Sequence, residues 1–200
     1  MMIPKLIHQI WVGPHPIPDK FTQFMENIKT LHPEYEYRLW TDKDLTTSNF
    51  TLYEYIEKTP IYAQKADIMR YEILYKYGGI YLDVDFEIFK NLTPILTNSL
   101  IICNEDFNVN EYIANCFFAC TPNNPNLKRC MENIKHCKLG QKMVTLDTGP
   151  HYFRKCIKLD ETVKLLPIHV MYPINFHQRG YRPSKFHPET YGMHHWYKSW

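Results

Sequence analysis

Two aspartates separated by one residue, Asp83 and Asp85, directly follow a short apolar run at residues 80–82. Carboxylates at positions i and i+2 of an extended segment lie on one side of the chain, roughly 6.5 to 7 Å apart at their Cα atoms. Both can therefore turn toward one divalent cation and its bound phosphates. An isolated Asp-x-Asp is a weak signal, since two acids at a strand end are more often solvated turn residues. The string GGIYLDVD strengthens it, and we expect a metal-diphosphate site here.

A second charged pair, Asp67 and Arg70, lies in the segment before these aspartates. At a spacing of three residues the two share a helix face, where an ordinary ion pair contributes about 0.2 to 0.5 kcal/mol. The alternative gives them separate roles. Asp67 would accept hydrogen bonds from sugar or ribose hydroxyls, and Arg70 would donate to phosphate or sugar oxygens.

The segment that must position these four groups is predicted to be a helix followed by a buried strand. Apolar residues recur at helical spacing across residues 60–77, and Gly78 and Gly79 predict the end of that helix. The strand at residues 80–82 would then carry the aspartates to its carboxyl end. Open α/β sheets bind their ligands at that end of their strands.

The rest of the chain predicts one α/β domain, because no internal repeat or linker interrupts residues 1–200. Strands are expected at residues 5–12, 35–40, 99–103 and 116–120, and helices at 18–31, 126–137 and 148–158. Thr41 and Asp42 are expected to cap a short helix. Asp147 or Thr148 would cap the last helix, with Pro150 in its first turn.

The last thirty-seven residues are less regular and locally cationic. Five histidines and many aromatic residues accompany one acid, Glu189, and the basic residues Lys164, Arg179, Arg182, Lys185 and Lys198. One interpretation is a solvated coil that closes the fold. The other is a lid over a diphosphate or an acceptor, since cations and histidines complement phosphate charge.

Composition excludes several classes of function. The formal net charge of +2 gives no electrostatic footprint for binding nucleic acid. Six cysteines form no C-x-x-C pair, which indicates reduced thiols and no zinc site or disulfide framework. No segment reaches the eighteen apolar residues of a membrane span. We therefore expect a cytoplasmic protein without a transmembrane segment, and peripheral membrane contact stays open.

Five segments together carry a family resemblance: IPKLIHQIWVG, HPEYEYRLWTD, ADIMRYEILYKYGGIYLDVD, LDTGP and the closing HHWYKSW. In this order they resemble the DxD sugar-binding glycosyltransferases of family 32, essentially from end to end. That family includes an initiating α-1,6-mannosyltransferase and α-1,4-galactosyltransferases, and its core is similar to that of the large glucosylating toxins. The resemblance implies a GT-A fold, Rossmann-like with a mixed central sheet. Donor binding would occupy about residues 1–105, and the acceptor side with a closing C-terminal flap about residues 106–200.

The resemblance also implies roles for individual residues. Trp11 matches the tryptophan that stacks on the donor base, although a tryptophan at a strand end also packs in cores. Asp67 and Arg70 match the donor-binding pair, and Asp83 and Asp85 the metal-diphosphate pair. Further matches are a polar position near the sugar and the closing C-terminus, at Asn115, His194 or His195, Ser199 and Trp200. Of the two histidines, one would complete the metal site, because imidazole suits Mn²⁺ better than Mg²⁺.

The function implied is transfer of a hexose, with retention of configuration, from a nucleotide-diphosphate sugar to a glycan or other hydroxyl acceptor. Mn²⁺ or Mg²⁺ would be the cofactor; a UDP-sugar is the first choice of donor and GDP-mannose the second. One alternative is a phosphohydrolase with Asp83 as nucleophile and Asp85 as acid/base. Phe86 and Glu87 argue against it, since such enzymes usually continue with Gly-Thr or Thr. Another alternative is a noncatalytic module that binds nucleotide sugars or glycans.

Overall fold

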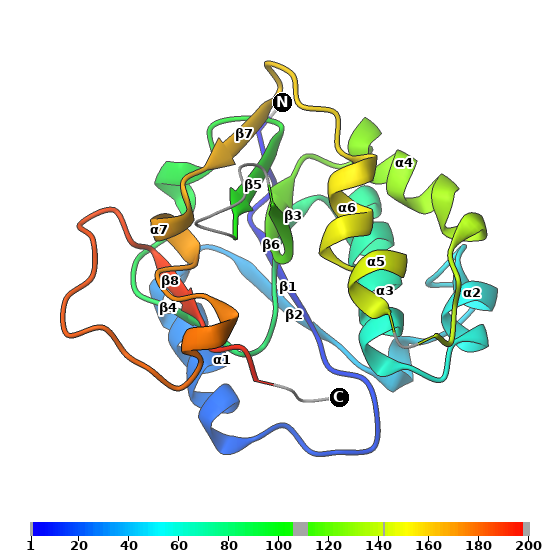
Figure 1. Cartoon of the computed structure of the whole chain (residues 1–200), viewed down its shortest axis with the longest axis horizontal. Coiled ribbons are helices and arrows are strands. Elements are labelled where there is room, and N and C mark those ends of the chain that lie inside the picture. Colours follow the sequence, from blue (N-terminus) through cyan, green and yellow to red (C-terminus); the bar gives the residue numbers. More distant parts are fainter. Residues whose placement is uncertain (1, 106–111, 142, 198–200) are drawn as a thin grey trace.

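A mixed sheet of six strands forms the centre of the computed structural model, which describes residues 2–105, 112–141 and 143–197 (Figure 1). The strands are, in spatial order, β2 (Glu36–Trp40), β1 (Leu6–Ile10), β3 (Gly79–Leu82), β6 (Ile113–Cys120), β5 (Leu100–Asn104) and β7 (Val163–Leu166). Strand β6 runs antiparallel to both neighbours, and the other pairings are parallel. The carboxyl ends of five strands therefore share one edge of the sheet with the beginning of β6.

Helices and a small second sheet cover the two faces of the central sheet (Figure 1). One side holds α2 (Tyr53–Lys58), α3 (Tyr62–Tyr77), α4 (Pro125–Asn133), α5 (Val144–Asp147) and α6 (Pro150–Cys156). The other holds α1 (Asp19–Leu31), α7 (Ile168–Met171) and the antiparallel pair β4 (Phe86–Ile88) and β8 (Gly192–His194). The 3₁₀ turns are η1 (Asp42–Asp44), η2 (Thr93–Ile95), η3 (Ile134–His136) and η4 (Phe176–Gln178).

Two apolar cores lie on the two faces of the central sheet. Successive side chains of each strand point alternately into one core and the other. In β3 the side chain of Tyr81 joins the core beneath α3, whereas Ile80 and Leu82 join the core shared with α1 and α7. Helix α3 has buried residues around most of its circumference because it lies between the sheet and its neighbouring helices. This burial on all sides fixes the helix that carries Asp67 and Arg70.

The turn from α3 into β3 depends on two glycines. Gly78 and Gly79 have φ values of +63° and +93°, a region that favours glycine. A Cβ at Gly79 would lie 2.6 Å from the carbonyl oxygen of Leu6, so the absence of a side chain lets β3 pair closely with β1. The predicted helix end at this pair is confirmed.

The predicted strands and main helices are present, with three exceptions in detail. Strands β4, β7 and β8 and the short helices α2, α5 and α7 lie where no strand or helix was expected. The short helix after Thr41 is a 3₁₀ turn that begins with a capping box. Gly149, and neither Asp147 nor Thr148, is the N-cap of α6, because Asp147 belongs to α5 and the Thr148 hydroxyl donates to Asp67. Pro150 is in the first turn as predicted.

The six cysteines are free thiols, in agreement with the sequence-based expectation. Among the described residues, no helix combines the length and apolar character needed to cross a bilayer.

Candidate active site

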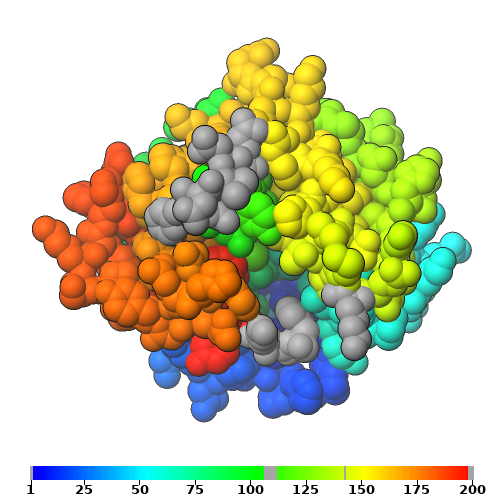
Figure 2. All heavy atoms as spheres, viewed as in Figure 1, coloured from blue at the N-terminus to red at the C-terminus, as the bar shows by residue number. Residues whose placement is uncertain are grey.

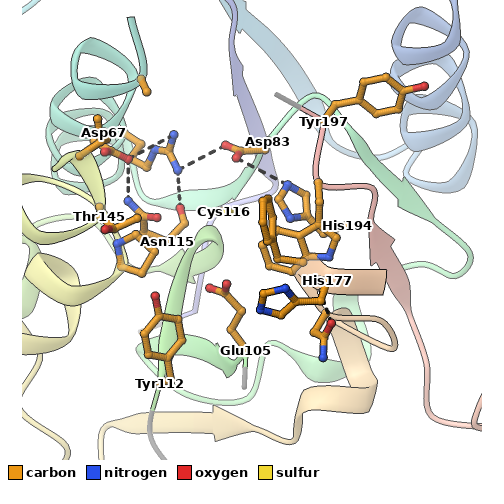
Figure 3. A pocket seen from close by; sticks show the side chains of 18 residues that line it. Asp67, Asp83, Glu105, Tyr112, Asn115, Cys116, Thr145, His177, His194 and Tyr197 are labelled. Carbon is orange, nitrogen blue, oxygen red and sulfur yellow. Dashed lines mark hydrogen bonds and ion pairs between the residues drawn. The ribbon is translucent and has the colours of Figure 1, made fainter. Parts of the chain in front are cut away.

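A cavity of about 600 Å³ opens at the edge of the sheet where the parallel strands end. Figure 2 shows it as a hollow between the yellow α5 and α6 and the orange segment around η4. Its size falls within the range of about 300 to 1,000 Å³ that is typical of small-molecule sites. The labelled side chains that line it in Figure 3 are Asp67, Asp83, Glu105, Tyr112, Asn115, Cys116, Thr145, His177, His194 and Tyr197.

Arg70 links the two charged pairs found in the sequence. Its guanidinium lies 3.5 Å from the Asp67 carboxylate and 3.3 Å from that of Asp83, and it donates to the Asn115 carbonyl oxygen at 2.7 Å (Figure 3). Its side chain is only 5% exposed. The spacing of Asp67 and Arg70 therefore does produce an intrahelical ion pair, and the same arginine also holds the first aspartate of the Asp-x-Asp.

Asp67 is satisfied from two sides by other parts of the chain. Oδ1 accepts from the Asn115 side-chain amide at 2.7 Å, and Oδ2 accepts from the Thr148 hydroxyl at 2.8 Å. Burial raises the pKa of Asp67 to about 6, although Arg70 acts in the opposite direction. Asp67 and Asn115 both line the cavity. Their predicted contacts with donor hydroxyls stay a prediction.

The two aspartates of the Asp-x-Asp occupy different environments. Asp83 lines the cavity with a side chain that is 21% exposed, and its Oδ1 accepts from the Tyr81 hydroxyl at 2.6 Å. Asp85 is only 6% exposed at its side chain. Its Oδ1 lies 3.0 Å from His194 Nε2, and its Oδ2 accepts from the Tyr197 backbone N–H at 2.9 Å. Only Asp83 therefore faces the cavity directly.

His194 and His195 lie apart although they are adjacent in sequence. His194 Nε2 lies 3.8 Å from Asp83 and 3.0 Å from Asp85, whereas its buried Nδ1 has no hydrogen-bond partner. Burial opposes protonation of His194, but Asp85 and Asp83 together raise its pKa above the ordinary value. His195 Nε2 instead contacts Glu87 at 2.9 Å, outside the residues that line the cavity. Of the two candidate ligands, His194 is the one whose imidazole lies beside the carboxylates of the Asp-x-Asp, whereas His195 contacts Asp85 through its backbone N–H.

Ligand atoms of Asp83, Cys116 and His194 lie within 4.8 Å of one another (Figure 3). Burial raises the pKa of the Cys116 thiol above its ordinary value. A thiol is also a poorer ligand than a carboxylate for Mn²⁺ or Mg²⁺, which prefer oxygen donors. The Asp83 carboxylate and the His194 imidazole remain as donors, and Asp85 contacts the same imidazole nitrogen, Nε2, at 3.0 Å. This donor chemistry fits a divalent cation such as Mn²⁺.

Trp11 does not line this cavity. It is 7% exposed, packs edge-on against Phe21, and donates through its indole N–H to the His15 carbonyl oxygen at 2.8 Å. Its predicted stacking on a nucleotide base stays a prediction. Ser199 and Trp200 lie outside the described residues.

Several residues at the cavity were missed in the sequence. Glu105 follows β5 just as Asp83 follows β3, so its place after a strand could have indicated it. Cys116 is next to Asn115 on β6. His177 and Tyr197 belong to the histidine-rich and aromatic tail, where no motif or spacing distinguishes them from their neighbours.

Comparisons with known proteins agree with this geometry. Residues 18–104 match a family described as "Glycosyltransferase sugar-binding region containing DXD motif". An uncharacterized glycosyltransferase of Acanthamoeba polyphaga mimivirus is 32% identical, over 100% of this chain and 84% of its own length. Inositol phosphoceramide mannosyltransferase 3 of Schizosaccharomyces pombe is 43% identical over 47% of this chain. This chain spans 27% to 56% of the length of the three relatives that carry that enzyme name.

Solved structures with related folds include a PaToxG glycosyltransferase, with a TM-score of 0.59 and 21% identity over 78% of this chain and 69% of that one. The glycosyltransferase domain of the YGT toxin has a TM-score of 0.60 and 11% identity, over 82% of this chain and 80% of its own. At such identities the likeness concerns the fold, which is the predicted GT-A fold. From the sequence relationships, the chain belongs to the family of glycosyltransferases whose sugar-binding region contains a DXD motif.

Proposed function

We propose that this protein transfers a hexose, with retention of configuration, from a nucleotide-diphosphate sugar to a hydroxyl acceptor, using a divalent cation held beside Asp83. The observation that carries the proposal is the convergence of Asp83, Arg70 and His194 on one cavity at the carboxyl edge of the sheet. Family membership supports the same reaction class. The cavity volume also suits a small molecule such as a nucleotide sugar.

Asp83 and His194 would hold the cation, and Asp85 would orient the His194 imidazole, which it contacts at 3.0 Å. When bound, the cation would neutralise the negative charge that develops on the departing diphosphate. Arg70 contributes by fixing the Asp83 carboxylate at 3.3 Å, so that the ligand does not have to reorganise when the donor binds. Tyr81 restrains the same carboxylate through its hydroxyl. The chain thus supplies a preorganised carboxylate that lines the cavity.

The names of the relatives suggest which donor sugars to test first. Three fission-yeast relatives are inositol phosphoceramide mannosyltransferases, which makes mannose the first sugar to test in this chain. UDP-sugars, favoured from the sequence, form the second class. A screen with GDP-mannose, UDP-glucose and UDP-galactose therefore covers both bases.

The test is release of nucleoside diphosphate by the purified protein, with and without Mn²⁺. We expect Mn²⁺-dependent release from one donor class, and its loss in Asp83→Asn at an unchanged melting temperature, because an amide lacks the charge that binds the cation. Failure of every donor to be hydrolysed or to raise the melting temperature would contradict the proposal. Binding without turnover would instead favour a noncatalytic module.

The phosphohydrolase alternative predicts a different substrate. Such an enzyme would hydrolyse a phosphomonoester such as p-nitrophenyl phosphate, with Asp83 as nucleophile. Such enzymes usually also present a lysine at the site. Among the described residues no lysine lines the cavity, which argues against this alternative. Turnover of the phosphomonoester in place of a nucleotide sugar would favour this alternative.

A further inference from the structure

Two histidines and a glutamate come together at the junction between α7 and the turn that precedes β8. They are His169, in α7, and His187 and Glu189, in the turn (Figure 1). One ligand atom from each of the three lies within 4.8 Å of the other two. None of the three residues lines the cavity that Asp83 faces. The cluster is therefore a group of potential metal ligands that the proposed function does not use.

Hydrogen bonds fix the two segments of this cluster to each other. The Thr190 hydroxyl donates to the carbonyl oxygen of His169 at 2.8 Å. The Tyr191 backbone N–H donates to the carbonyl oxygen of Val170 at 2.8 Å, and the Thr190 N–H closes the turn by donating to the His187 carbonyl oxygen at 2.9 Å. The three side chains are thus presented by backbones that are already joined before any ligand binds.

The distances between the ligand atoms suit a small cation. Nε2 of His169 lies 3.5 Å from Oε2 of Glu189, and Nδ1 of His187 lies 4.0 Å from the same oxygen. Bonds of about 2.0 to 2.2 Å to a tetrahedral metal place the ligand atoms roughly 3.3 to 3.6 Å apart. The Glu189 side chain is 72% exposed, so its rotation can close the remaining difference.

Both imidazoles offer a nitrogen that a metal can use. Nε2 of His169 is shielded from solvent and has no hydrogen-bond partner among the described residues. Nδ1 of His187 accepts from the Glu189 backbone N–H at 3.1 Å, so it carries the lone pair that a metal requires. A cation bound at the cluster would replace that hydrogen bond and would also satisfy Nε2 of His169.

An ordinary ion pair explains the cluster less well. The rings of His169 and His187 lie 4.1 Å apart at their centres, so two protonated imidazoles would repel each other. One carboxylate could neutralise only one of them. With both rings neutral, the cluster carries one negative charge and three donors. Sets of imidazole and carboxylate suit Zn²⁺ better than Mg²⁺ or Ca²⁺, which prefer oxygen ligands alone.

We infer that His169, His187 and Glu189 bind a borderline divalent metal such as Zn²⁺, separate from the cation proposed beside Asp83. Three protein ligands leave one tetrahedral position for water. The metal would join α7 to the turn that leads into β8, the strand that ends at His194, and would act as a structural clamp. The inference does not depend on the proposed function, because it uses none of the residues that line that cavity.

Calorimetric titration of ZnCl₂ into the tag-free, chelator-treated full chain tests the inference. All proteins carry Asp83→Asn, which removes a donor from the other cluster of potential ligands. The ligand variants are His169→Gln, His187→Gln and Glu189→Gln. The control is His15→Gln, since His15 is exposed and belongs to neither cluster of the described residues. We expect each ligand variant to weaken Zn²⁺ binding by at least the ten- to hundred-fold that loss of an outer-shell partner typically costs, and the control to leave it unchanged.

Melting curves without metal check that each variant folds, and the same curves with Zn²⁺ give a second readout. Zn²⁺ should raise the melting temperature of the parent and of His15→Gln more than that of the ligand variants, because it binds only the folded cluster. Unchanged Zn²⁺ affinity in His187→Gln and Glu189→Gln, or equal weakening in His15→Gln, would overturn the inference. Displacement of Zn²⁺ by an equal concentration of Mg²⁺ would also overturn it, since attraction between charges alone would then explain the binding.

Discussion

The two walls of the cavity of about 600 Å³ hold their charged groups by different means. On one wall, helix α3 and strands β3 and β6 contribute Asp67, Arg70 and Asp83, which are joined to one another by buried ion pairs and hydrogen bonds. On the other, β8 contributes His194 from a strand of three residues that pairs only with β4. The first wall belongs to the central sheet and to the helix α3 that packs on it, whereas the second belongs to the small separate sheet that covers the opposite face.

The second wall carries backbone strain that the first lacks near its charged groups. Trp196 has a φ of +57°, a conformation that costs a residue with a side chain about 1–2 kcal/mol. Its indole N–H donates to the Ile174 carbonyl oxygen at 3.2 Å, and the next residue, Tyr197, donates to Asp85. These contacts maintain the strained turn. Motion of the predicted flap stays a prediction, but its described part, residues 194–197, includes the buried His194 and Trp196 and is integrated in the fold.

The comparison predicts the largest loss of stability on the first wall. Arg70→Met should lower the free energy of unfolding by about 3–5 kcal/mol, because it leaves the buried Asp67 and the partly exposed Asp83 without the cation that they share. Chemical denaturation measures this change. Arg38→Met is the matched control, since Arg38 pairs with Asp44 at 3.3 Å but is 39% exposed, and should cost about 1 kcal/mol or less. Equal losses in the two variants would contradict the account of the first wall.

The contribution of His8, a residue of β1 beside the first wall, to the free energy of unfolding should also depend on pH. His8 accepts from the Trp40 indole at 3.2 Å and contacts the Gly78 carbonyl oxygen at 3.1 Å, so the neutral ring is fully satisfied. Burial lowers its pKa from 6.5 to about 4. The unfolded chain therefore binds more protons between these values, and the contribution of His8 to stability falls as pH falls through that window, by up to about 3 kcal/mol.

His8→Gln isolates this effect, because glutamine can still donate to Gly78 and has no charged form. The pKa of Asp67 is raised in the folded protein, so its contribution to stability changes with pH in the opposite direction over an overlapping range. This contribution is the same in the unaltered protein and in His8→Gln, and it cancels in their comparison. Denaturation at several pH values should show a steeper loss on acidification in the unaltered protein than in the variant. Parallel curves would mean that His8 titrates normally.

The smallest effect is expected at the outer edge of the second wall. Glu87 binds His195 and Arg182, and these contacts lower its pKa to about 2 even though burial acts in the opposite direction. Because the site is near the surface, Glu87→Gln should cost only about 1 kcal/mol of stability. The Mn²⁺ dependence of donor hydrolysis should not change, because Asp85 and not Glu87 contacts His194. A changed Mn²⁺ dependence in Glu87→Gln would mean that the contacts of Glu87 with His195 and Arg182 also help to position His194.

The same contrast explains what the sequence could predict. Helix α3, its glycine end and the strand before Asp83 are encoded by local patterns of apolar residues and by turn chemistry, and they were identified to within two residues. Strands β4 and β8 have three residues each and pair across about a hundred positions of the chain, so no local pattern marks them. Their formation depends on tertiary contacts.

The site shows the same limit at the level of single residues. His194 is the last residue of β8 and His195 directly follows it, so their side chains point to different sides, but no periodic pattern indicated which of the two would face Asp85. Because Asp83 and Asp85 lie on the same side of an extended segment, the sequence predicted the same metal-binding role for both. In the structure, residues 194–197 pack over Asp85 and bury it, whereas Asp83 stays partly exposed. The network through Arg70 was out of reach because Asn115 is forty-five residues away.

A Mn²⁺ titration of donor hydrolysis in His194→Ala and His195→Ala tests the central claim most directly. His194 Nε2 lies 3.0 Å from Asp85 and 3.8 Å from Asp83, whereas His195 contacts Glu87. The account predicts that His194→Ala raises the half-saturating Mn²⁺ concentration about ten-fold or more, and that His195→Ala leaves it unchanged. His194→Asn and melting curves would separate loss of a ligand from loss of folding. An unchanged metal dependence in folded His194 variants, or a shift only in His195→Ala, would contradict the account.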